Sequence, residues 1–168
     1  MLQIEKRTEI AHDLLLIQQE RLLFYEQAAR LFNSDEDIYK CIQSIAKQCM
    51  HFILELRPHA DLRATDPADF FDIRGEIYQR WQMQGLKANC QPADMISTCE
   101  ENERAITSAY EKALVEEHPI GRNLHQLFSK QLRKIFEALS LLQSHKKPTV
   151  PEPVSKEKQF CVMWTTRV

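Results

Sequence analysis

Glycine is scarce in this chain: the 168 residues include only Gly75, Gly85 and Gly121. β-Sandwiches and barrels need glycine in their tight turns, and nucleotide-binding α/β folds need a cluster of glycines next to the phosphates. The sequence therefore excludes both classes. The residues it has instead, chiefly Leu, Ala, Gln, Glu and Lys, favour helices. We predict an all-α protein.

Long apolar runs, a strong net charge and paired cysteines are also lacking. No stretch reaches the roughly eighteen apolar residues of a membrane helix, and charged residues occupy the start, so we expect neither a membrane partner nor a signal peptide. The net charge of −2 provides no broad basic face for nucleic acid. The five cysteines form no Cys-x-x-Cys pair. We expect reduced thiols and a cytoplasmic location.

Apolar residues recur at alternating spacings of four and three, which is typical of amphipathic helices. The predicted helices cover about 9–32, about 38–56, a segment from Pro92 to beyond 113, and about 118–144. Ser34 and Asp37 resemble a capping box for the second helix, and Pro58 ends it. Because the hinges within each half are short, we expect the first and second helices, and the third and fourth, to be antiparallel neighbours.

A long connection separates the two predicted helix pairs. It contains its own predicted helix, about 68–84, and long crossovers occur in ferritin-like bundles rather than in simple up-down bundles. We therefore assign 1–145 to one four-helix domain. The remaining residues, 146–168, form a proline-rich linker and an apolar tail.

Several polar residues interrupt or flank the apolar seams: Gln18, Gln48, His51, Glu103, Gln131 and Lys134. An internal similarity between the two halves pairs Tyr25 with Tyr110, within Tyr-Glu-x-Ala in each case. By the same similarity Gln18 corresponds to Glu103, Gln48 to Gln131, and His51 to Lys134. Two hairpins related by a pseudo-twofold axis would bring these residues together in a polar layer, with both tyrosine hydroxyls directed into it. Chance similarity between amphipathic helices is the alternative explanation.

The stretches 13–29 (DLLLIQQERLLFYEQAA) and 99–114 (CEENERAITSAYEKAL) resemble a bacterial ferritin-like four-helix-bundle family of unknown function. The resemblance covers about 8–143 and includes the predicted crossover helix. It implies a ferritin-like bundle of two antiparallel hairpins joined by a long crossover.

Metal-binding ferritin-like proteins use one Glu from each of two helices and Glu-x-x-His from each of the other two. The resemblance places Gln18, Gln48–His51, Glu103 and Gln131–Lys134 at these positions. One carboxylate and one histidine remain, and neutral glutamines cannot offset the charge of two metal ions. The expected di-metal site is therefore degenerate, and we expect no catalytic residues and no cofactor, with iron as the alternative.

Glu103 and Lys134 are the charged members of the predicted layer. We predict that they form a buried ion pair whose ammonium occupies the space of the lost metal, because each charge is costly to bury alone. If Lys134 is solvated instead, His51 and Glu103 become the candidate ligands of a single metal ion. A polar layer that only fixes helix register, and a small-ligand pocket between the helices, are further interpretations.

Three functions are consistent with these features. The first is a non-catalytic interaction or stress-associated module, which could form homo-oligomers. The second is a metal-binding protein that oxidises or stores iron. The third is an adaptor whose tail docks a partner through Phe160, Trp164 and Val168, because the terminal Thr-x-Val resembles a PDZ-domain ligand.

Overall fold

The computed structural model describes residues 2–32, 35–60, 92–115 and 120–145. They form four long helices and one 3₁₀ turn: α1 (Leu2–Leu31), α2 (Glu36–Leu56), η1 (Arg57–His59), α4 (Pro92–Val115) and α5 (Arg122–Ser144). No strand occurs within these ranges, so the all-α prediction is confirmed for them. The predicted crossover helix 68–84 and the tail 146–168 lie outside the described residues.

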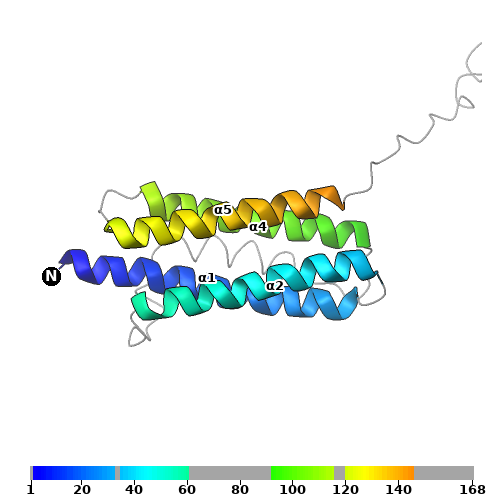
Figure 1. The fold of residues 1–168 in the computed structure, drawn as a ribbon, viewed down its shortest axis with the longest axis horizontal. Coiled ribbons are helices and arrows are strands. Elements are labelled where there is room, and N and C mark those ends of the chain that lie inside the picture. The colour runs from blue at the N-terminus through cyan, green and yellow to red at the C-terminus, as the bar shows by residue number, and fades with distance from the viewer. Residues whose placement is uncertain (1, 33–34, 61–91, 116–119, 146–168) are drawn as a thin grey trace, which may run out of the picture.

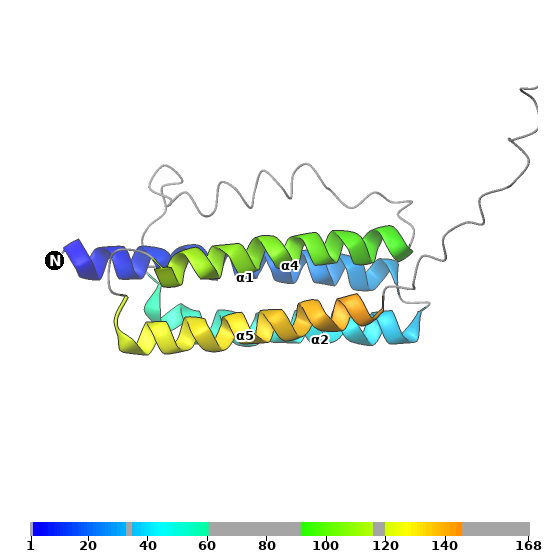
Figure 2. The same ribbon diagram turned by 90° about the horizontal axis from the view of Figure 1, so that it is seen from above.

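The four helices lie lengthwise beside one another (Figures 1 and 2). α1 packs antiparallel to α2, and α4 packs antiparallel to α5. The two hairpins meet through contacts of α1 with α4 and of α2 with α5. As Figure 2 shows, α2 ends at one end of the molecule and α4 begins at the other, so these two helices run in the same direction.

The starts of three helices differ from the predicted ones. α1 begins at Leu2 because most residues of its first two turns, although they lack apolar periodicity, have good helix propensity. The N-cap of α2 is Asp35, whose carboxylate accepts from the backbone N–H of Ile38 at 3.1 Å, so the predicted Ser34–Asp37 capping box is wrong. α5 begins after Gly121, where a φ of 83° interrupts helical geometry.

The apolar core consists of two clusters, one toward each end of the helices. One joins the first half of α1, the second half of α2, the second half of α4 and the first half of α5. The other joins the complementary halves of the same helices. Between them lie four fully buried polar side chains, those of Gln18, Arg21, Glu103 and Gln131.

The cysteines and the helix surfaces add two observations. Cys41, Cys49 and Cys99 are buried and reduced. Among the described helices, none is both long enough and apolar enough to span a membrane.

Candidate functional site

A buried ion pair lies at the midpoint of the four helices. The guanidinium of Arg21 on α1 donates from Nε to Glu103 Oε1 at 2.9 Å and from Nη2 to Glu103 Oε2 at 2.7 Å. Both side chains have no exposed surface. The two parallel bonds form the fork-on-fork geometry that gives arginine–carboxylate pairs their strength, and they join α1 directly to α4.

Two glutamines complete the contacts of the guanidinium. Nη1 donates to Gln18 Oε1 at 3.2 Å, and Nη2 donates to Gln48 Oε1 at 2.9 Å. The guanidinium carbon also lies 5.9 Å from the centroids of the Tyr25 and Phe52 rings, within the range of cation–π attraction. α2 therefore supplies one acceptor through Gln48 and α4 supplies two through Glu103, so the positive charge of Arg21 lies between these helices and α1.

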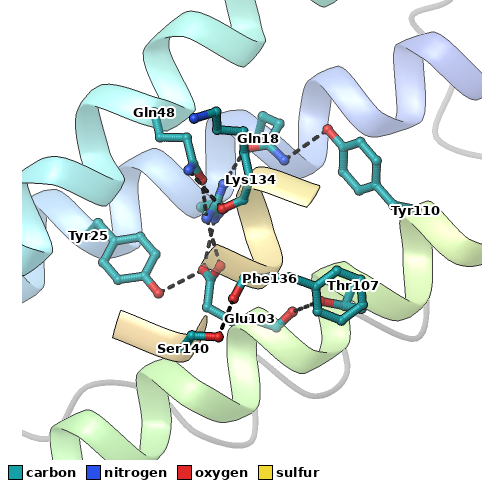
Figure 3. Close-up of polar contacts among 10 residues, drawn as sticks. Gln18, Tyr25, Gln48, Glu103, Thr107, Tyr110, Lys134, Phe136 and Ser140 are labelled. Carbon is teal, nitrogen blue, oxygen red and sulfur yellow. Dashed lines mark hydrogen bonds and ion pairs between the residues drawn. The ribbon is translucent and has the colours of Figure 1, made fainter. Parts of the chain in front are cut away.

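Each of the two tyrosine hydroxyls forms a hydrogen bond with a polar side chain of the other helix, α1 or α4 (Figure 3). The Tyr25 hydroxyl on α1 donates to Glu103 Oε1 on α4 at 2.8 Å. In return, Tyr110 on α4 accepts from Gln18 Nε2 on α1 at 3.0 Å. Exchanging Tyr25 with Tyr110 and Gln18 with Glu103 converts one contact into the other, as the internal similarity of the sequence predicts for a pseudo-twofold axis.

A chain of hydrogen bonds leads from this centre to the surface. Tyr110 donates to Gln131 Oε1 at 2.7 Å, and Gln131 Nε2 donates to Glu55 Oε2 at 3.0 Å. The other oxygen of Glu55 accepts from Lys130 at 2.6 Å, where both side chains are partly exposed. Through Glu55, the polar network also joins α2 to α5.

Burial and the ion pair set the protonation states. Burial favours neutral arginine, but the adjacent Glu103 carboxylate outweighs it and the pKa of Arg21 is raised. Burial, with Glu103 nearby, raises the pKa of Tyr25, and burial raises the pKa of Tyr110. Burial opposes ionisation of Glu55, yet its bonds from Lys130 and Gln131 leave the pKa of this carboxyl lowered. At neutral pH Arg21 is therefore a cation, and both tyrosine hydroxyls are neutral.

The structure brings together most of the predicted polar layer but not its two basic members. Gln18, Glu103, Gln131 and both tyrosines are buried, and Gln48 is partly buried. Gln48 Nε2 donates to the backbone oxygen of Lys134 at 3.0 Å (Figure 3).

The predicted Glu103–Lys134 ion pair is wrong. The Lys134 side chain is 49% exposed and lies 3.2 Å from Glu137, one turn along the same helix. A long lysine at the edge of a helix face extends into water instead of burying its ammonium. His51 is exposed as well, so the structure does not bring it to Glu103 as a second metal ligand.

Arg21 is the residue that the sequence analysis missed. A buried stripe on α1 runs through Leu14, Gln18, Arg21, Tyr25 and Ala28, with spacings of four and three. The predicted polar layer did not include Arg21, because an arginine is rarely fully buried. The available signal was its spacing from Gln18 and Tyr25, which puts all three on one face.

The chemistry of this centre is that of a satisfied ion pair. Within the described ranges, no group of three or more His, Cys, Asp or Glu side chains could hold a metal ion. The acceptors at the centre are already bound to a guanidinium, which repels a metal cation. Comparisons with protein-family models, curated proteins and solved structures find no match to the chain.

Proposed function

We propose that the chain is a ferritin-like four-helix bundle without metal chemistry, which acts as a non-catalytic interaction module. The directions of the helices support the fold assignment. Ferritin-like bundles have one long crossover connection. Here that connection joins the last residues of α2, at one end of the molecule, to the first residues of α4, at the other end (Figure 2).

The observation that carries the proposal is the place of Arg21. Its guanidinium is bonded to Glu103, Gln18 and Gln48, three of the four positions at which the ferritin-like resemblance expects a metal-binding glutamate. The charge supplied by external metal ions in iron-binding bundles is supplied here by the chain itself. Such a centre stabilises the association of the hairpins and has no open coordination position.

The interaction role rests on apolar side chains that face solvent. Met50 and Leu54 lie one turn apart on α2 and are 53% and 62% exposed. We expect this face to contact a second protein surface, and self-association is the simplest form of that contact. Sedimentation of the wild type and of Met50→Lys/Leu54→Lys over a range of concentrations tests it. Dimers that the double variant lacks support the role, and two identical monomeric profiles contradict it.

Iron loading tests the absence of metal chemistry. The full chain is incubated anaerobically with Fe(II), exposed to air, desalted and analysed for bound iron, with a known ferritin treated in parallel. We expect no stoichiometric iron and no faster Fe(II) oxidation than in buffer. Binding of roughly two iron ions per chain, the complement of a di-iron bundle, would overturn the proposal in favour of iron oxidation or storage.

A further inference from the structure

We infer that the centre of the four helices is a preformed binding site for a guanidinium cation, which the native chain fills with its own Arg21. The inference does not depend on the ferritin-like assignment, because it follows from contacts among described residues alone. The ligand class is an alkylguanidinium ion, the chemical equivalent of the arginine side chain.

The acceptors match the shape of that ion. Both oxygens of Glu103, with Gln18 Oε1 and Gln48 Oε1, receive N–H groups of one planar fork. The rings of Tyr25 and Phe52 add two aromatic contacts to the same cation. An ammonium ion or a spherical metal ion presents no planar fork and would satisfy fewer of these groups.

Each acceptor is also held by a contact that does not involve Arg21. Tyr25 donates to Glu103 at 2.8 Å, and Gln18 donates to Tyr110 at 3.0 Å. Gln48 is anchored through its amide nitrogen on the α5 backbone. Because these contacts survive truncation of Arg21, the acceptors remain placed for a cation, and preorganisation of this kind favours binding.

The charge left behind favours uptake of a cation over collapse of the site. Glu103 has no exposed surface. A buried carboxylate that has lost its cation is strongly destabilising, so a cation that enters restores a matched pair. The substitution Arg21→Ala removes the atoms of ethylguanidinium, which is therefore the best-fitting probe.

The test is chemical rescue of the full-length Arg21→Ala variant, with unfolding followed by circular dichroism. A ligand that binds only the folded state raises Tm by mass action, so ethylguanidinium chloride on the order of 10 mM should raise Tm by about 3 °C or more, and further additions should raise it with the logarithm of the concentration. Sodium chloride at equal ionic strength and urea should give no such rise, and guanidinium should give a smaller one. The wild type and Arg104→Ala, which loses an exposed arginine of the same charge, should show none.

The double variant Arg21→Ala/Glu103→Gln identifies the site, because without the carboxylate the rescue should disappear. An equal rise of Tm in this variant, or in the wild type, would overturn the inference. If Arg21→Ala is unfolded in buffer, ethylguanidinium should restore its helical dichroism, whereas sodium chloride should not. An Arg21→Ala chain whose folding and Tm do not respond to ethylguanidinium refutes the preformed site.

Discussion

Removing one member of the Arg21–Glu103 pair should lower the free energy of unfolding at least as much as replacing both members by apolar residues. Arg21→Met leaves the Glu103 carboxylate buried without its cation, and Glu103→Leu leaves the guanidinium without its anion. Each substitution should lower the free energy of unfolding by about 3–5 kcal/mol. The side chains of both residues are fully buried, so solvent does not screen the loss.

Arg21→Met/Glu103→Leu removes both charges together. The remaining cost comes from Gln18, Gln48 and Tyr25, which lose hydrogen-bond partners at the centre. We expect the double variant to lose about 3 kcal/mol, well below the sum of about 6–10 kcal/mol for independent substitutions. Urea unfolding of the four proteins of this double-mutant cycle measures the coupling. Additive costs would refute the description of the pair as mutually dependent.

The exposed ion pair between Glu36 and Lys40 is the matched control, because its side chains are 80% and 66% exposed. The same cycle there should give a coupling of no more than about 0.5 kcal/mol.

Moving the buried carboxylate provides a second check. Gln18→Glu/Glu103→Gln should be more stable than Glu103→Gln alone, because Gln18 Oε1 already lies 3.2 Å from Arg21 Nη1. A carboxylate at position 18 would therefore lie beside the guanidinium. A double variant less stable than the single one would contradict the shared centre.

Three further predictions concern single side chains, through their hydrogen bonds, their exposure or their burial. Tyr25→Phe and Tyr110→Phe should each lower the free energy of unfolding by about 1–3 kcal/mol, because buried hydrogen-bond partners are left unmatched; unchanged urea midpoints would show that the hydroxyls are dispensable. Lys134→Met should change the free energy of unfolding by less than about 0.5 kcal/mol, since that side chain is half exposed. A larger loss would show that the Lys134 side chain contributes to the core. Burial raises the pKa of Cys41 and Cys49 from 9.0 to about 11, so these thiols ionise at lower pH in the unfolded chain than in the folded one. The stability that the neutral thiols contribute below pH 9 is therefore lost as the pH rises toward 11. The loss should approach about 1.4 kcal/mol per pH unit for Cys49, which has no exposed surface, and should be smaller for Cys41. A Cys41→Ala/Cys49→Ala variant with the same alkaline slope would exclude the thiols as the cause of the loss.

The helices were predictable from the sequence because their periodicity is a local property. The spacing of Ile42, Ile45, Cys49 and Phe52 defines the inner face of α2, and all four are buried. The ends were less predictable, because an aspartate cap at Asp35 and the positive φ of Gly121 compete with neighbouring signals of similar strength. The helices of each hairpin are antiparallel because short loops leave no other choice.

The candidate site was only partly predictable, because burial of a charge depends on its partner. Glu103 stood out as a carboxylate on an apolar seam, and the internal similarity placed Tyr25 and Tyr110 beside it. The identity of the cation did not follow from the sequence: both Arg21 and Lys134 lie within a turn of a seam glutamine. Only the packed structure decides between them, by placing the guanidinium against the carboxylate and leaving the ammonium in water.

The most direct test of an internal cation at the centre is the exchange of arginine side-chain protons with solvent, measured by NMR on the ¹⁵N-labelled full chain. We expect the Arg21 Nε–H signal to persist at alkaline pH, to show contacts with the Tyr25 and Phe52 rings, and to disappear in Arg21→Lys. An Arg21 Nε–H that exchanges as fast as that of exposed Arg104 would contradict a buried guanidinium and, with it, the proposal that this chain has replaced a metal centre by one of its own side chains.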